Sequence, residues 1–181
     1  MIDINVGRFI KMPQSDEEYY FHQTPVELAK KLLEYVPLEQ GDSICEPFKG
    51  QGAFYDNFPA GHTKEWSEIR EGRSYTHWED DCFDWIISNP PFRLEINGKL
   101  KNMFFPLVEY WLKRANKGVA FLMSDVCFGS LTPIRMAVVK ELGFSITKIV
   151  ICNVKKWRGR YYFVIFEKTE NDLVDYLPGN Y

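Results

Sequence analysis

Residues 83–92 read FDWIISNPPF, an apolar run of strand length followed by a loop that cannot extend it. The run at 83–88 is apolar nearly throughout, which is typical of a strand buried on both faces of a parallel sheet. Pro90 and Pro91 have fixed backbone angles and lack the N–H that a further strand pairing would need. The stretch therefore predicts a buried strand that presents a rigid loop at its carboxyl end.

Strand-like and helix-like segments alternate on both sides of this stretch. Thr-Pro at 24–25 and again at 132–133 supplies a capping hydroxyl and a proline at the first helical position, and Gly143 ends the second helix. The alternation predicts an α/β, Rossmann-like fold: a mostly parallel, doubly wound sheet ending in an antiparallel hairpin. Beyond 83–88, we expect strands at 42–46, 63–69, 118–124, 146–152 and 161–168, and helices at 24–36, from 53, at 103–115 and at 132–143.

Length and composition limit the classes of protein that fit. The 181 residues suit one domain over 21–181, and residues 1–20 are expected to form an N-terminal arm. A net charge of −3 means that any nucleic-acid surface must be local. The four cysteines form no CxxC pair and no metal-ligand spacing, so no metal is expected. No apolar run suits a signal peptide or a membrane span, which favours a soluble cytoplasmic protein without membrane partners.

Two loops leave the carboxyl ends of predicted strands, the edge at which doubly wound sheets bind ligands. In EPFKGQG (46–52), Gly50 and Gly52 let the backbone approach a ligand, although a plain turn would use the same residues. Glu68 lies near the end of the next expected strand, at a position that commonly binds ribose hydroxyls, although a solvated surface glutamate is the alternative. The other loop is Asn89–Phe92. We therefore expect both loops to line one rim.

The loop NPPF has the groups needed to hold a planar amine. The Pro90 carbonyl and the Asn89 side-chain oxygen can both accept from an exocyclic amine that lies on the face of Phe92. Such bonds draw the nitrogen out of planarity and free its lone pair to attack a sulfonium methyl, so placement does most of the work. A loop that merely ends a strand is the alternative, but it has no need of the aromatic residue.

Together these motifs resemble the S-adenosylmethionine-dependent amino-methyltransferases, most closely the adenine-specific DNA members. That family carries an [Asn/Asp/Ser]-Pro-Pro-[Tyr/Phe/Trp] loop, and in one subgroup the cofactor motifs and a Thr-Pro helix start precede it. FHQTP at 21–25, EPFKGQG at 46–52 and NPPF at 89–92 follow that order. The resemblance covers roughly residues 20–167 and implies a class I methyltransferase fold with S-adenosylmethionine as cofactor.

The resemblance implies a role for each residue that matches a family motif. Asn89, Pro90, Pro91 and Phe92 would form the catalytic loop, with Asn89 also touching the cofactor. Glu46 would face the cationic amino-acid part of the cofactor. The remaining cofactor-binding residues would be Gln23, Thr24, Pro25, Pro47, Phe48, Gly50, Gly52, Glu68, Ser74 and Tyr75.

Two departures from the family pattern stand out. Ser74-Tyr75 occupies the place of an Asp-Phe pair beside the cofactor adenine, so that carboxylate is missing. A long target-recognition domain is also missing, so we expect a short recognition sequence, a separate specificity partner or a homodimer.

The segment NVKKWRGR gains interest as a result. Cations interleaved with aromatics suit phosphate contact and base stacking, although a charged hairpin tip is the alternative; they are Lys155, Lys156, Trp157, Arg158 and Arg160.

The expected activity is methylation of the 6-amino group of adenine in DNA. Relatives with similar loops methylate adenine in RNA, guanine in ribosomal RNA and the glutamine side chain of release factors, so these substrates stay open. A non-catalytic cofactor-binding subunit is the alternative from another class, but such a subunit would have no need of an intact NPPF loop.

Overall fold

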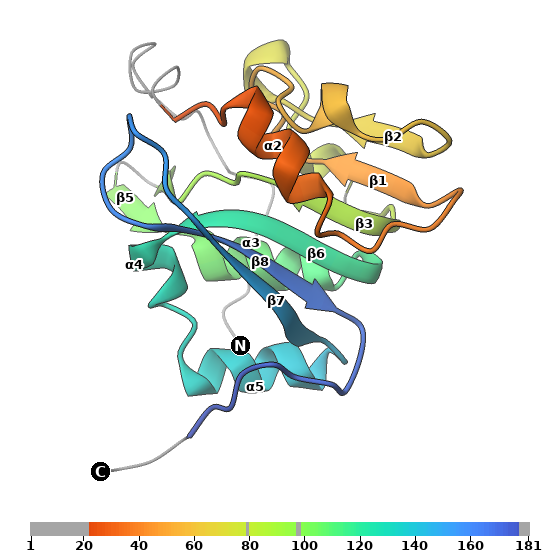
Figure 1. The fold of residues 1–181 in the computed structure, drawn as a ribbon. Coiled ribbons are helices and arrows are strands. Elements are labelled where there is room, and N and C mark those ends of the chain that lie inside the picture. Colours follow the sequence, from red (N-terminus) through yellow and green to blue (C-terminus); the bar gives the residue numbers. More distant parts are fainter. Residues whose placement is uncertain (1–21, 79, 97–98, 178–181) are drawn as a thin grey trace.

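A computed structural model describes residues 22–78, 80–96 and 99–177 (Figure 1). Their strands form a six-stranded sheet in the order β2-β1-β3-β6-β8-β7, and a separate two-stranded sheet of β4 and β5. The predicted N-terminal arm at 1–20 lies outside the described residues. The strands are β1 Ser43–Glu46, β2 Thr63–Trp66, β3 Phe83–Ser88, β4 Arg93–Ile96, β5 Lys99–Asn102, β6 Ala115–Ser124, β7 Ser145–Cys152 and β8 Tyr161–Glu167. The helices are α2 Val26–Leu33, α3 Phe104–Leu112, α4 Asp125–Phe128 and α5 Pro133–Glu141, with 3-10 turns η2 Tyr55–Asn57, η3 Ile69–Glu71 and η4 Tyr75–Trp78.

The sheet has the predicted directions. Strands β2, β1, β3 and β6 run parallel to their neighbours. Strand β8 runs antiparallel to both β6 and β7, as the last two apolar segments of the sequence predict. The mostly parallel, doubly wound α/β sheet with a terminal antiparallel hairpin is therefore confirmed.

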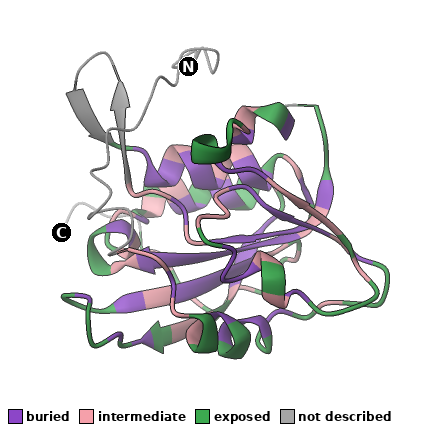
Figure 2. Cartoon of the chain, turned by 90° about the horizontal axis from the view of Figure 1, so that it is seen from above, coloured by how far each residue is buried: buried purple, intermediate pink, exposed green. Residues whose placement is uncertain are grey.

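Side chains alternate between two buried layers along the central strands, because successive residues of a strand point to opposite faces. On β3, Trp85 and Ile87 join the layer under α2, whereas Ile86 joins the layer that includes α3 and α5. Figure 2 shows the buried strands of the sheet between these layers. Both faces of β3 are thus covered, as its apolar sequence predicts.

Strand β3 is tightly packed below the loop that it carries. A Cβ on Gly118 would lie 2.3 Å from the Trp85 ring and 2.7 Å from the Phe166 carbonyl oxygen. Only glycine therefore lets the Trp85 ring lie across β6. This close packing fixes the Trp85 ring, four residues before Asn89.

Several local expectations are wrong. Thr132 is the N-cap residue of α5, but its side chain makes no capping hydrogen bond, and the strand expected at 63–69 ends at Trp66. Thr24 does not cap α2: Pro25 is the N-cap residue, without a side-chain cap, and the Thr24 hydroxyl instead accepts from Asn89. The helix expected from residue 53 is only the 3-10 turn η2, and Pro59 follows the turn closely. At Thr24, a contact with a distant loop decides the local structure.

Candidate active site

The loops after β1 and β3 meet where the strand order reverses. From β1 the chain continues to β2 on one side and then returns to β3 on the other. Ligands of doubly wound sheets bind at such a switch point, beyond the carboxyl ends of the strands. The end of β3 contacts the loop after β1 directly, since the Ser88 hydroxyl donates to the Phe48 carbonyl oxygen at 3.4 Å. The structure thus brings both predicted loops to one rim.

The glycine loop has a backbone that requires its glycines. Gly50 has a φ of 54° and Gly52 a φ of 83°. A Cβ on Gly50 would lie 2.5 Å from Gln23 Oε1, and one on Gly52 would lie 2.5 Å from Asp56 Oδ2. Gln23 Oε1 also accepts from the Gln51 amide at 2.9 Å, so the segment before α2 is fastened to this loop.

Two buried carboxylates hold the glycine loop. Glu46 is 2% exposed and accepts from the Tyr55 amide at 2.6 Å, and burial raises the pKa of its carboxyl well above the ordinary value. Glu68 is 7% exposed and accepts from the Gly50 amide at 2.7 Å and from the Arg70 amide at 3.0 Å. Both carboxylates therefore have structural partners at the positions where the sequence predicts cofactor contacts.

The Asn89 side chain is oriented by residues that precede α2. Its Nδ2 donates to the His22 carbonyl oxygen and to the Thr24 hydroxyl, each at 3.2 Å. A carbonyl oxygen can only accept, so the amide nitrogen must face His22. The side-chain oxygen of Asn89 therefore faces away from this segment. This arrangement explains why the Thr24 hydroxyl is not used as a helix cap.

The rest of the NPPF loop is well supported. Pro90 is buried, and Pro91 and Phe92 are half-buried. The Phe92 ring meets Phe104 edge-on with centroids 6.4 Å apart, and the Phe92 carbonyl accepts from the Met103 amide at 3.2 Å. Helix α3 therefore positions the aromatic residue of the loop.

The Tyr75 ring of the Ser74-Tyr75 pair packs beside the glycine loop. The Tyr75 ring lies 5.3 Å from the Phe48 ring and meets Tyr110 edge-on at 5.5 Å. Burial raises the pKa of the Tyr75 hydroxyl above its ordinary value. The Ser74 hydroxyl accepts from the Thr76 amide and hydroxyl, at 3.3 and 3.0 Å. Tyr75 is thus close to the cofactor motif despite the missing carboxylate.

The basic loop between β7 and β8 is divided between surface and core. Lys155, Lys156, Arg158 and Arg160 are exposed. Trp157 is only 5% exposed and packs against Tyr161 with ring centroids 4.6 Å apart. Because its ring is buried, Trp157 anchors the loop and does not offer the base-stacking surface that the sequence suggested.

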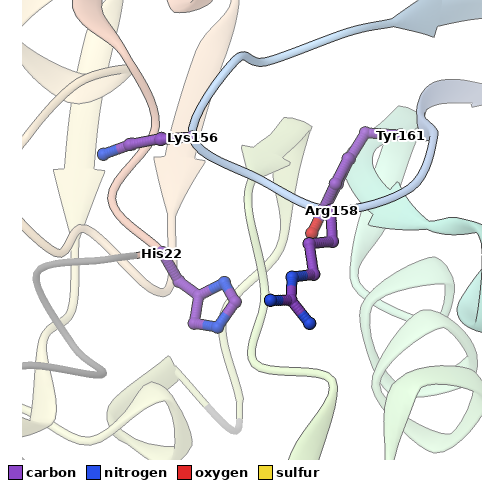
Figure 3. A pocket seen from close by; sticks show the side chains of 4 residues that line it. All are labelled: His22, Lys156, Arg158 and Tyr161. Carbon is purple, nitrogen blue, oxygen red and sulfur yellow. The ribbon is translucent and has the colours of Figure 1, made fainter.

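One pocket joins the basic loop to the segment before α2. It has a volume of about 600 Å³ and is lined by His22, Lys156, Arg158 and Tyr161, as Figure 3 shows. Sequence reasoning gave no role to His22 or Tyr161. The only signal in the sequence is that His22 belongs to FHQTP and Tyr161 follows the basic run.

Within residues 22–78, 80–96 and 99–177, no group of His, Cys, Asp or Glu side chains is arranged to hold a metal ion. None of the helices in that part of the chain has the length and apolarity needed to cross a membrane.

Comparisons with known proteins show the class of fold. No protein-family model matches the sequence, and no curated protein matches it either. A protein from Listeria monocytogenes assigned as a class I S-adenosylmethionine-dependent methyltransferase superposes with a TM-score of 0.57 at 16% identity over 85% of this chain and 62% of that one. A protein from Vibrio vulnificus assigned as the modification subunit of a type I restriction enzyme gives 0.59 at 13% identity, over 81% and 44%. Magnesium protoporphyrin IX methyltransferase from Synechocystis PCC 6803, with bound S-adenosylmethionine, gives 0.56 at 12% identity, over 90% and 88%.

These likenesses define the protein's architecture as that of class I S-adenosylmethionine-dependent methyltransferases. The chain spans less than two thirds of the length of the first two structures.

Proposed function

We propose that this protein transfers a methyl group from S-adenosylmethionine to the exocyclic 6-amino group of adenine in DNA. The observation that carries this proposal is the orientation of Asn89. Its amide nitrogen is occupied by His22 and Thr24, which leaves the side-chain oxygen available as an acceptor beside Pro90. An acceptor at this point of the loop is what a donating amine requires.

The rim fits the proposed cofactor. Gly50 and Gly52 have positive φ, so the loop leaves backbone free of side chains where a ligand approaches the switch point. Phe48 and Tyr75 provide apolar ring surface next to it. The Glu68 carboxylate contacts the same loop, since it accepts a hydrogen bond from the Gly50 amide. When bound there, S-adenosylmethionine would supply an electrophilic methyl group.

The NPPF loop would bind and orient the target amine. Asn89 Oδ1 and the Pro90 carbonyl oxygen would accept its two protons, while the Phe92 ring would support the base. No strong general base is needed, because the amine lone pair is freed by these hydrogen bonds and by close, in-line placement. The loop follows directly on β3, whose Trp85 ring packs closely against Gly118.

Three features favour adenine in DNA over other planar amines. The order of FHQTP, EPFKGQG and NPPF resembles the adenine-specific DNA enzymes. Lys156 and Arg158, exposed cations of the β7–β8 loop, can contact a phosphate backbone. A modification subunit of a restriction enzyme is among the structures with a similar fold. In a duplex the target base would have to be flipped out, at a cost of a few kcal/mol.

The test is transfer of labelled methyl groups from S-adenosylmethionine to DNA, RNA and protein pools, with mass analysis of the product. We expect N6-methyladenine in DNA. Asn89→Ala should abolish transfer while leaving cofactor affinity in calorimetry nearly unchanged. Asn116→Ala, at an exposed asparagine near the amino end of β6 and away from the rim, should not change transfer. Labelled methyl groups in RNA or in protein glutamine would replace DNA adenine as the substrate. If calorimetry showed no cofactor binding, the protein would be a non-catalytic subunit.

A further inference from the structure

The pocket lined by His22, Lys156, Arg158 and Tyr161 carries an inference about how the substrate is held (Figure 3). Three of these residues come from the end of the β7–β8 loop and the start of β8. His22 comes from the segment before α2. The pocket therefore exists only where two distant parts of the chain meet.

The chemistry of the pocket favours an anion. Lys156 and Arg158 are exposed, and neither belongs to an ion pair among residues 22–78, 80–96 and 99–177. By contrast, Lys117 pairs with both Glu39 and Asp42. The acid close to the loop is Asp125, whose Oδ2 would lie 3.4 Å from a Cβ on Gly159 and whose Oδ1 accepts from the Val126 amide.

A phosphodiester suits this pocket better than S-adenosylmethionine does. S-adenosylmethionine carries a sulfonium and an ammonium group beside a single carboxylate, so its net charge is positive and two cations in the pocket would disfavour it. A phosphodiester has one negative charge and accepts from lysine, guanidinium and hydroxyl donors alike. Tyr161 supplies a hydroxyl, and its ring is held against Trp157. The buried Trp157 thus fixes the side of the pocket that the exposed cations complete.

The pocket is also connected to the proposed catalytic loop through one residue. The His22 side chain lines the pocket, while the His22 carbonyl oxygen accepts from Asn89 Nδ2 at 3.2 Å. A group bound in the pocket therefore contacts the residue that orients Asn89. We propose that this pocket binds a phosphate of the nucleic-acid backbone next to the target nucleotide, an inference that rests on the proposed function.

The first test measures binding, independently of methyl transfer. Fluorescence anisotropy is recorded with a labelled adenine-containing single-stranded oligonucleotide across a salt series. Lys156→Gln and Arg158→Gln should each weaken binding about tenfold and lower the salt slope by about 0.7, the share of one phosphate contact. Tyr161→Phe removes only the hydroxyl and keeps the ring against Trp157, so it should weaken binding several-fold.

Lys155 and Arg160 provide matched controls, because they are exposed on the same loop but do not line the pocket. Lys155→Gln and Arg160→Gln should change affinity less than twofold. Equal losses for all four substitutions would overturn the proposal, because the loop would then act as a diffuse basic surface. Absence of oligonucleotide binding by the wild-type protein would overturn it as well.

The second test locates the phosphate. Neutral methylphosphonate linkages are placed one at a time around the adenine. One linkage should weaken binding to the wild-type protein but have no further effect on Arg158→Gln, and equal effects at every linkage would contradict the proposal. A single sensitive linkage without methyl transfer would support the phosphate site and reject the proposed activity. Methyl transfer without any sensitive linkage would support the activity and reject the phosphate site.

Discussion

The substitution Gly50→Ala tests whether Gln23 fastens the segment before α2 to the glycine loop. The φ of Gly50 is 54°, in the left-handed region where a residue with a Cβ loses about 1–2 kcal/mol. The new Cβ would lie 2.5 Å from Gln23 Oε1 and 3.2 Å from Gln23 Cδ. Since atoms do not approach so closely, the Gln23 amide would have to leave the Gln51 N–H to which it is bound at 2.9 Å.

Gly72→Ala is the matched control for this effect. Gly72 has a φ of 77°, and a Cβ there would meet nothing within 4 Å. Backbone strain alone predicts that Gly50→Ala costs no more free energy of unfolding than Gly72→Ala, because the left-handed minimum lies at a φ of about 57°. The lost Gln23 hydrogen bond adds about 1 kcal/mol to Gly50→Ala only. In a chain of this size, that lowers Tm by about a further 2–4 °C.

The assay is urea unfolding followed by tryptophan fluorescence, in the wild-type and Gln23→Ala backgrounds. We expect Gly50→Ala to be the more destabilising substitution in the wild type. With Gln23 truncated, the extra cost should disappear, because the new Cβ no longer meets an amide. Equal free energies of unfolding for Gly50→Ala and Gly72→Ala in the wild type would refute the reasoning.

Substitutions at three further residues address the rim. Thr24→Val removes one acceptor of the Asn89 amide, so turnover should fall up to about tenfold, by a larger factor than cofactor affinity; Thr24→Ser should restore turnover, and full activity of the valine variant would contradict the role of this bond. Burial raises the pKa of Glu46 above 4.5, so the native state binds more protons than the unfolded chain and stability falls as pH rises above that value. Glu46→Gln should therefore raise Tm relative to wild type more at pH 8 than at pH 5 in scanning calorimetry; an equal difference at both pH values would rule this out. Glu68→Gln should weaken cofactor binding in calorimetry if Glu68 holds the ribose; a loss of stability alone would limit Glu68 to its bond with the Gly50 amide.

The sheet is predictable because its signals are local. The apolar run at 83–88 matches β3 at both ends, since burial on both faces admits few polar residues and Asn-Pro-Pro cannot continue a strand. Gly143 also ends α5 with a positive φ of 84°, as its position predicts. Periodicity and strand breakers therefore predict the strands and the fold class without any tertiary information.

The details that differ depend on contacts between distant segments. Thr24 has the sequence of a helix cap, but its hydroxyl is used by Asn89, which lies far along the chain. Trp157 stands among exposed cations, yet its ring fills the core beside Tyr161. No local pattern reports such contacts. For the same reason the sequence placed Glu46 at the rim but did not show that its carboxylate is buried against the Tyr55 amide.

The partners of the Asn89 amide have a consequence for dissecting the protein. His22 and Thr24 precede α2 and contribute no strand to the sheet. A chain that begins at Pro25 would keep all six strands of the main sheet, yet its asparagine would have neither acceptor. Folding and turnover would then be separable, as in a split enzyme. A short peptide carrying residues 22–24 would be the fragment to add back, because it supplies the two acceptors that orient the Asn89 amide.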